Sequence, residues 1–204
     1  DGVDDYIQLS SPALVGETPI TIMFRAKSTY SSSMDVISQA CVDDCEAADF
    51  RLQFSASYLQ CEGISFMDTP SHLATYAFNV SDNKWHNYTY VFGENDNYHH
   101  HNIKIYVDGM PISLDCNRCT LTDPLYDWEC AHNWGSWTYS LPDVPMTIGK
   151  AWNYSESYFS GYIYNVAVFS KSLSMEEVLE YVDYSFSGNE NDLVGYWNFN
   201  EGSG

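Results

Sequence analysis

Oxygen-bearing side chains gather near both ends of the chain. They are Asp1, Asp4 and Asp5 at the start and Asn198, Asn200 and Glu201 at the end. Ca²⁺ takes roughly six to eight oxygen ligands, mainly carboxylates and carbonyls. If the two terminal strands pair, these groups converge on one rim of the fold. The sequence therefore predicts a Ca²⁺ site held by Asp1, Asp4, Asp5, Asn200 and Glu201, with a solvated acidic turn as the alternative.

Six cysteines form a second group of residues that could form disulfides or bind a metal. All lie in loop-like stretches, at Cys41, Cys45, Cys61, Cys116, Cys119 and Cys130. An even number in such stretches predicts three disulfides formed in an oxidising compartment. The cysteines fall into two groups of three, so at least one bridge crosses between the groups if all six pair. The alternative is a zinc site using Cys116-x-x-Cys119 with a remote pair, although no second CxxC follows.

Several aromatic side chains lie in the least regular stretch, Cys116–Leu141. Ring faces of this kind stack on the C–H surfaces of sugars, while polar neighbours bind the hydroxyls. The candidate glycan-binding residues are Tyr126, Trp128, Trp134 and Trp137. In the alternative interpretation, these rings pack inside a Cys- and Trp-rich insertion at about 115–141.

Three N-glycosylation sequons occur along the chain: Asn79-Val-Ser81, Asn87-Tyr-Thr89 and Asn153-Tyr-Ser155. Asn87 lies inside a predicted strand, on the face opposite Tyr88 and Tyr90. If these two tyrosines fill the core, Asn87 faces solvent and can carry a glycan.

Composition limits the range of partners. Eight Lys and Arg residues stand against 28 Asp and Glu residues, a formal net charge of −20. Such a surface repels nucleic acid and anionic membranes. No stretch approaches the ~20 apolar residues of a membrane span. The absence of an initial Met and of a signal peptide indicates a segment of a longer or tandem protein.

The stretch Lys84–Leu114 organises the predicted fold. Within it, large aromatic residues alternate with smaller ones over 85–92, which is the period of a β-strand. A second strand covers Ile103–Val107, and Asp108-Gly109 is a favoured two-residue hairpin turn before a third. The sequence therefore predicts an antiparallel three-stranded meander with one long loop at Gly93–Asn102.

Several motifs resemble the laminin G-like jelly roll of the concanavalin A-like superfamily, and they occur in the expected order. They are DGVDDYIQL at Asp1–Leu9, ITIMFRAK at Ile20–Lys27, Lys84-Trp85-His86, IKIYVDG at Ile103–Gly109, MTIGK at Met146–Lys150, SGYIYNVAVF at Ser160–Phe169 and SKSLSMEEV at Ser170–Val178. The resemblance covers most of the chain outside 28–78 and 115–144. It implies one all-β domain over residues 1–204, a two-sheet antiparallel β-sandwich, usually extracellular and usually for binding or adhesion. The length of 204 residues suits one large sandwich.

Two departures from the pattern of the superfamily bear on chemistry. Glucanase relatives carry paired carboxylates in an E-x-D-x-x-E strand, whereas Glu94-x-Asp96 is followed by His99 where the second Glu would stand. Relatives often bind Ca²⁺ on a rim and show G-x-I-D-E, but this chain has Tyr164-Asn165 in place of the acidic pair. The first departure predicts a protein without catalytic activity, and the second weakens the transfer of a calcium site.

The end of the chain predicts a short helix and a final strand. Ser174-Met-Glu-Glu177 is a capping box, and the helix that it begins is expected to cover one end of the sandwich. The tail Leu193–Gly204 either pairs with the opening strand Asp1–Leu9, where Tyr6 and Ile7 are expected to be buried, or completes a neighbouring module or subunit.

These features together predict a non-enzymatic extracellular recognition or adhesion module that binds a glycan or an extracellular protein, with Ca²⁺ as the candidate cofactor. One alternative is a repeating structural subunit of an extracellular filament, coat or surface appendage, which self-assembles with identical or tandem units. The other is the accessory glycan-binding module of a glycan-active enzyme.

The calcium site predicts a thermal stability that depends on the ion. An ion that binds the folded state alone raises Tm, so we expect added Ca²⁺ to raise it and EDTA to lower it. A Tm that neither addition changes would contradict the site.

Overall fold

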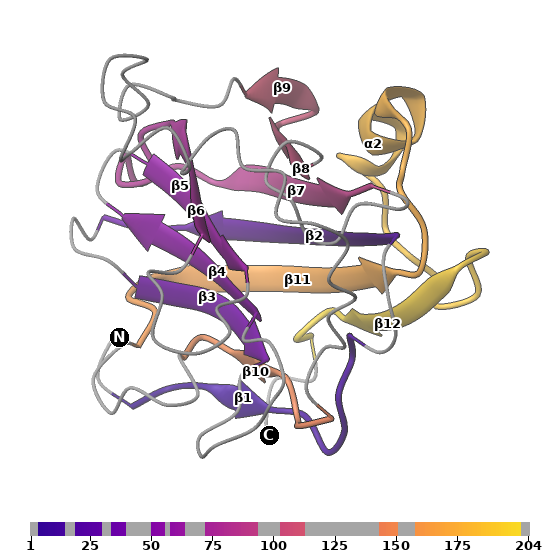
Figure 1. The fold of residues 1–204 in the computed structure, drawn as a ribbon, viewed down its shortest axis with the longest axis horizontal. Coiled ribbons are helices and arrows are strands. Elements are labelled where there is room, and N and C mark those ends of the chain that lie inside the picture. The colour runs from indigo at the N-terminus through magenta and orange to yellow at the C-terminus, as the bar shows by residue number, and fades with distance from the viewer. Residues whose placement is uncertain are drawn as a thin grey trace.

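The computed structural model describes residues 4–14, 19–29, 34–39, 50–55, 58–63, 72–93, 103–112, 143–150 and 158–200. These residues form two six-stranded antiparallel sheets and one α-helix (Figure 1). This architecture confirms the predicted all-β sandwich with a short helix near the C-terminus. Within the same residues, every helix is too short or too polar to cross a membrane.

Sheet A contains the strands that follow one another in the order β1-β10-β3-β4-β5-β6. Their bounds are β1 Ile7–Gln8, β10 Thr147–Ile148, β3 Met34–Gln39, β4 Phe50–Ser55, β5 Tyr58–Gly63 and β6 His72–Ala77. Strands β4 and β5 are consecutive in the chain and pair antiparallel as a hairpin.

Sheet B has the order β12-β11-β2-β7-β8-β9. Its strands are β12 Leu193–Trp197, β11 Tyr162–Phe169, β2 Ile20–Lys27, β7 His86–Phe92, β8 Ile103–Val107 and β9 Met110–Ile112. Strands β7, β8 and β9 pair in sequence, which confirms the predicted meander. Asp108 and Gly109 have φ values of 51° and 77°, as the two-residue turn requires.

Aromatic side chains fill the space between the two sheets. Phe24 of β2 stacks on Tyr88 and Tyr90 of β7, with ring centroids 5.2 Å and 5.9 Å apart. Phe54 of sheet A packs against Phe24 and Tyr88 at 6.1 Å and 4.8 Å. Tyr88 and Tyr90 are fully buried, as the alternation of β7 predicts. Asn87 therefore lies on the opposite face of β7, where it is half-buried.

Strand β11 contains a bulge that the sequence pattern does not reveal. Its register with β2 shifts between Ile163 and Asn165, so Tyr164 has no partner of its own on β2. A strict alternation would place Tyr164 inward with Val166 and Val168, which are buried. Instead Ile163 packs against the core and Tyr164 is exposed. An extra residue in one strand has this effect because it shifts the inward–outward alternation of the side chains by one residue from one side of the bulge to the other.

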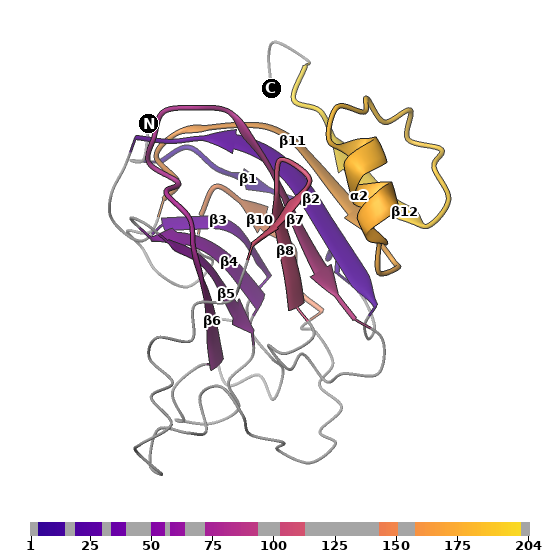
Figure 2. The ribbon, with the colours of Figure 1, turned by 90° about the horizontal axis from the view of Figure 1, so that it is seen from above.

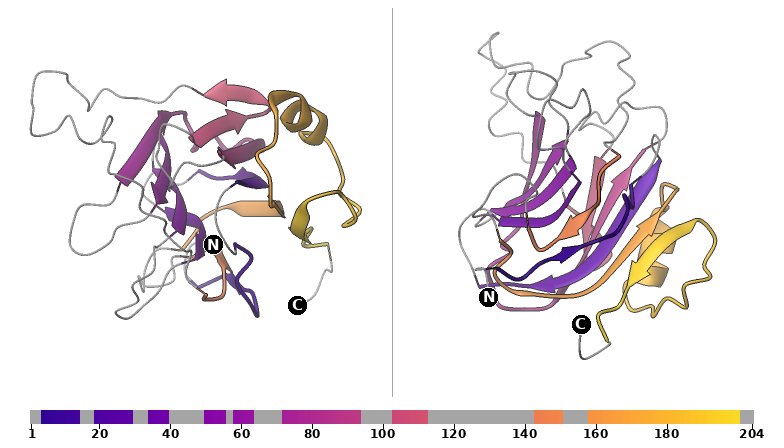
Figure 3. Two further views of the ribbon diagram at one scale, coloured as in Figure 1. Left: turned by 45° about the vertical axis from the view of Figure 1, so that its right-hand side comes forward. Right: turned by 90° about the horizontal axis from the view of Figure 1, so that it is seen from below.

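The two terminal strands do not pair with each other, and that prediction is wrong. β12 pairs with β11 in sheet B, whereas β1 pairs with β10 in sheet A (Figures 1 and 3). The last strand thus completes a sheet of its own chain, as predicted, but beside a different strand. The prediction that Tyr6 and Ile7 are buried is also wrong, because β1 is a two-residue edge strand and both side chains are exposed.

Helix α2 (Met175–Tyr181) begins with the predicted capping box. The Ser174 hydroxyl accepts a hydrogen bond from the Glu177 amide, and the Glu177 carboxylate accepts one from the Ser174 amide. The helix does not cover an end of the sandwich as expected. It lies on the face of sheet B that is turned away from sheet A (Figure 2). There Val178 packs in a second apolar cluster with Met23, Ala167 and Phe169.

The cap predicts a stability change on substitution of Ser174. Replacing it by Ala removes the acceptor for an otherwise unpaired helix amide and should lower the free energy of unfolding by about 1 kcal/mol. Ser174→Asp keeps an acceptor at this position and is the matched control. Chemical denaturation of the three proteins measures the effect, and equal stability of the Ala variant and the wild type would contradict the role of the cap.

Candidate functional site

The outer face of sheet B, which is the face turned away from sheet A, is only partly covered. Helix α2 packs over Met23 of β2, but the next outward residues of the same strand, Arg25 and Lys27, lie beyond it. The strand register places Arg25 between Asn87 of β7 and Asn165 of β11. Three neighbouring strands therefore present a row of polar side chains beside the helix.

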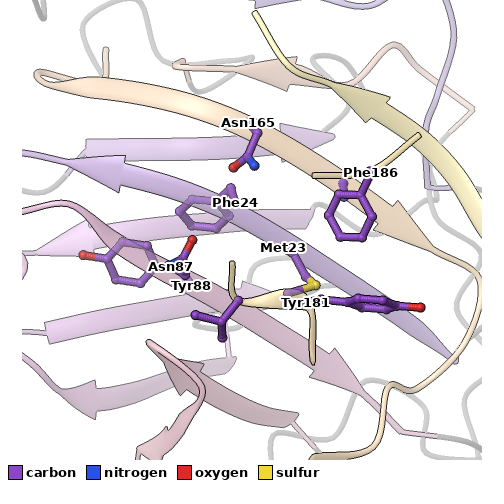
Figure 4. Close-up of a pocket in the computed structure, with 9 residues that line it drawn as sticks. Met23, Phe24, Asn87, Tyr88, Asn165, Tyr181 and Phe186 are labelled. Carbon is purple, nitrogen blue, oxygen red and sulfur yellow. The ribbon is translucent and has the colours of Figure 1, made fainter. Parts of the chain in front are cut away.

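A shallow pocket lies where this row meets the helix. The amide residues Asn87 and Asn165 line it together with Met23, Tyr181 and Phe186 (Figure 4). The cavity has a volume of about 10 Å³ and is partly open to solvent. This is about the space that one water molecule needs. The pocket is therefore a shallow hollow that can receive a single polar group of a ligand, such as a hydroxyl.

Three exposed aromatic rings lie on the other side of the polar row. Trp85, Tyr162 and Tyr164 are 38%, 64% and 44% exposed. The Trp85 ring centroid is 6.3 Å from that of Tyr162 and 6.4 Å from that of Tyr164. These side chains come from the start of β7 and from β11, so the pairing of both strands with β2 brings them together.

Two cations lie over these rings. Lys27 Nζ is 4.8 Å from the Tyr162 ring centroid and 5.5 Å from that of Trp85. The Arg25 guanidinium carbon is 5.7 Å from the Trp85 centroid. All three distances and the ring types fit cation–π contacts. We call the five residues Trp85, Tyr162, Tyr164, Arg25 and Lys27 the aromatic–cation cluster.

Local structure fixes the positions of the rings. The bulge in β11 turns both Tyr162 and Tyr164 to the outer face. At the start of β7, His86 Nδ1 lies 2.6 Å from Asp108 Oδ2 and Nε2 lies 3.3 Å from Asp82 Oδ2, which holds the strand beside Trp85. At Gly161, a Cβ atom would lie 2.3 Å from the Lys27 carbonyl oxygen. Only glycine allows β11 to begin this close to β2.

Burial raises the pKa of the hydroxyls of Tyr88 and Tyr181, which line the pocket. Tyr196 lies outside the pocket lining but interacts with Asn165, which belongs to it. Burial raises the pKa of the Tyr196 hydroxyl, and a hydrogen bond with the Asn165 side chain opposes part of that rise. Tyr196 therefore stays neutral at physiological pH and fixes the amide of Asn165 beside the pocket.

The structure describes only some of the predicted calcium ligands. Asp4, Asp5 and Asn200 are exposed, while Asp1 and Glu201 lie outside the described residues. The reason given for their convergence, pairing of the terminal strands, is wrong. In the described part of the chain, no three His, Cys, Asp or Glu side chains are grouped so that they could hold a metal ion. The calcium site stays a prediction.

The other predicted sites lie mostly outside the described residues. This applies to the insertion at 115–141 with Tyr126, Trp128, Trp134 and Trp137, to Asn153, and to Cys41, Cys45, Cys116, Cys119 and Cys130. Cys61 lies within strand β5, so its predicted place in a loop is wrong. Of the remaining sequons, Asn79 is exposed and its side chain accepts a hydrogen bond from the Ser81 amide, while Asn87 lines the pocket.

Sequence reasoning did not identify the aromatic–cation cluster. The alternation of β2 and β7 was a usable signal, because it puts Arg25, Lys27 and Trp85 on outward positions. The sequence pattern did not reveal the bulge that exposes Tyr164. It also did not reveal that the helix covers part of the outer face of sheet B.

Solved structures with the same fold include a putative carbohydrate binding protein from Bacteroides ovatus, with a TM-score of 0.63, 13% identity, and coverage of 95% of this chain and 48% of that one. The Ruminococcus gnavus IT-sialidase CBM40 bound to α2,3-sialyllactose has a TM-score of 0.60 and 12% identity, with 88% and 97% covered. Domains LG4-5 of the mouse laminin α1 chain have a TM-score of 0.55 and 13% identity, with 86% and 42% covered. This chain has the laminin G-like jelly-roll fold.

This finding confirms the fold that the motifs predict, and identities this low bear on the fold alone. No protein-family model matches the chain, and no curated protein is similar to it in sequence. The chain spans less than half the length of the Bacteroides ovatus and laminin structures.

Proposed function

We propose that this jelly roll is a carbohydrate-binding module and that a glycan binds across the outer face of sheet B. The observation that carries the proposal is the gathering of three exposed aromatic rings beside a shallow pocket that includes the amides of Asn87 and Asn165. Exposed aromatic groups of this kind are costly to leave in water and commonly mark a binding surface. Two of the structural neighbours support the proposal, since one is a putative carbohydrate binding protein and another was solved with sialyllactose bound.

The residues of the site match the two kinds of surface of a sugar ring. The C–H face of a sugar is apolar and can stack on the rings of Trp85 and Tyr162, which are both exposed. The amides of Asn87 and Asn165 offer both donors and acceptors to sugar hydroxyls. The shallow pocket can receive one polar group of the glycan, and the rings would then support the sugar ring that carries it.

We further propose that the module acts outside the cell and without catalysis. The predicted disulfides and the sequons at Asn79, Asn87 and Asn153 support an extracellular location. The absence of a paired-carboxylate strand motif from the sequence supports a role in binding alone.

Removal of the aromatic rings tests the proposal. We expect Trp85→Ala and Tyr162→Ala each to lower the affinity for a glycan that the wild type binds by roughly tenfold or more, because each removes a stacking surface. A glycan array identifies the ligand, and calorimetry measures Kd. Denaturation of each variant checks that the fold is retained.

Tyr6→Ala is the matched control. Tyr6 is 45% exposed and also lies under a lysine, with Lys150 Nζ 4.6 Å from its ring centroid, but it belongs to the edge of sheet A. Its substitution should leave Kd unchanged. Unchanged affinity in both the Trp85 and the Tyr162 variant would place the site elsewhere, and a wild type that binds no glycan would contradict the function.

A glycan attached to Asn87 is expected to compete with a bound ligand. Asn87 lines the pocket, and a covalent glycan there would lie over the same outer face. In protein from a host that adds N-glycans, we expect molecules with a modified Asn87 to bind weakly. Thr89→Val removes the sequon while leaving Asn87 in place, and it should restore binding to that of bacterial protein. Mass spectrometry measures occupancy, and Asn79→Gln is the control. Equal binding by protein with fully occupied Asn87 would contradict the position of the site.

A further inference from the structure

The two cations of the aromatic–cation cluster have no acidic partner in the part of the chain that the structure describes. The contacts of Arg25 and Lys27 are with the rings of Trp85 and Tyr162. Lys150 likewise contacts the rings of Tyr6 and Tyr158, whereas two other basic residues are paired with carboxylates. Arg51 is paired with Asp35 at 2.8 Å, and Lys171 is paired with Glu177 at 2.5 Å. This difference is unexpected in a chain with 28 acidic residues and eight basic ones.

Arg25 also has an unused hydrogen-bond donor. Its Nε atom is buried and has no hydrogen-bond partner in the described structure. Buried donors are nearly always paired, because leaving one without an acceptor disfavours the folded state. Since Nε is not exposed to solvent, an acceptor supplied by a ligand would remove this deficit only if the side chain moves on binding.

The spacing of the two charges adds a second constraint. Arg25 and Lys27 are consecutive outward residues of one strand, which places them roughly 7 Å apart along the sheet. Like charges at this separation repel each other. Cation–π contacts offset part of this repulsion, but an anion bound near both side chains would offset more of it.

We infer that the glycan bound at this face carries an anionic group, a carboxylate or a sulfate, which Arg25 and Lys27 recognise together. The inference rests on the proposed function and names the class of ligand. The Arg25 guanidinium suits a two-oxygen group, since its planar donors match the geometry of carboxylates and sulfates. The rings of Trp85 and Tyr162 then hold the adjoining sugar ring. The net charge of −20 repels anions over a distance, but at physiological salt this field is screened within about 8 Å.

The test compares glycans that differ in the acidic group alone. Suitable pairs are sialyllactose and lactose, oligogalacturonate and its methyl ester, and a sulfated galactan oligosaccharide with its desulfated form. We expect the wild type to bind the acidic member of at least one pair about tenfold or more tightly, which is the range for charge-assisted hydrogen bonds.

Variants then locate the recognition. Arg25→Gln and Lys27→Gln should each reduce the preference for the acidic member by about tenfold while leaving the affinity for the neutral member nearly unchanged. Lys27→Gln keeps the inference testable if the change at half-buried Arg25 perturbs the fold. Lys104→Gln is the matched control, because Lys104 is exposed and lies on β8, paired with Val91 at the far end of the same sheet.

The outcomes separate this inference from the proposed function. A preference that is lost in the Arg25 and Lys27 variants and kept in the Lys104 variant supports the inference. Equal or tighter binding of the neutral members overturns it while the glycan-binding function stands. A preference that survives both substitutions also overturns it, since the anion is then recognised elsewhere. Binding of no glycan, acidic or neutral, overturns both proposals.

Discussion

The stacking of Phe24 between the two sheets is the contact on which the rest of the structure depends. Its ring lies against Tyr88 and Tyr90 within sheet B and against Phe54 of sheet A, so it ties both sheets into one core. Because side chains alternate along a strand, burying Phe24 also decides that Arg25 faces outward. A register slip of one residue would bury the charge and expose the aromatic ring. The same contact that builds the core therefore sets the chemistry of the outer face.

The outer face of sheet B is divided between packing and exposure. Helix α2 buries the part around Met23 and Phe169, while Trp85, Tyr162 and Tyr164 remain open to solvent. The pocket lies at the boundary of these two areas, where the helix forms a wall and the amides of Asn87 and Asn165 form part of the floor. A ligand at this boundary would contact apolar rings, amides and cations at once, which is the combination that an acidic sugar requires.

Residues far apart in the sequence make up this surface, and different local interactions fix the strands that carry them. The hydrogen bonds of His86 with Asp82 and Asp108 fix the start of β7. The bulge of β11 turns the Tyr164 side chain to the outer face of sheet B. The close approach at Gly161 brings the start of that strand against the Lys27 backbone. Such support keeps the site preformed, which favours binding because ordering mobile side chains on binding would lower the affinity.

The sequence alone was sufficient for the elements that depend on local chemistry. The alternation over 85–92, the Asp108-Gly109 turn and the Ser174 capping box each follow from the preferences of a few adjacent residues, and all three are present. The order of the motifs was enough to predict the jelly roll. The inward position of Tyr88 and Tyr90 also followed from the pattern, since a period of two puts both on one face and the face with the larger apolar area is the one that is buried.

The tertiary structure alone decided the contacts between distant segments. The final strand pairs with β11 and not with the opening strand, because sheet order depends on packing across the whole sandwich. The bulge at Tyr164 arises from register with β2, and the helix lies on a sheet face because Val178 needs the apolar cluster there. The aromatic–cation cluster results from the pairing of β7 and β11 with β2 together with the bulge in β11. Local patterns could place each of its residues on a strand, but not beside one another.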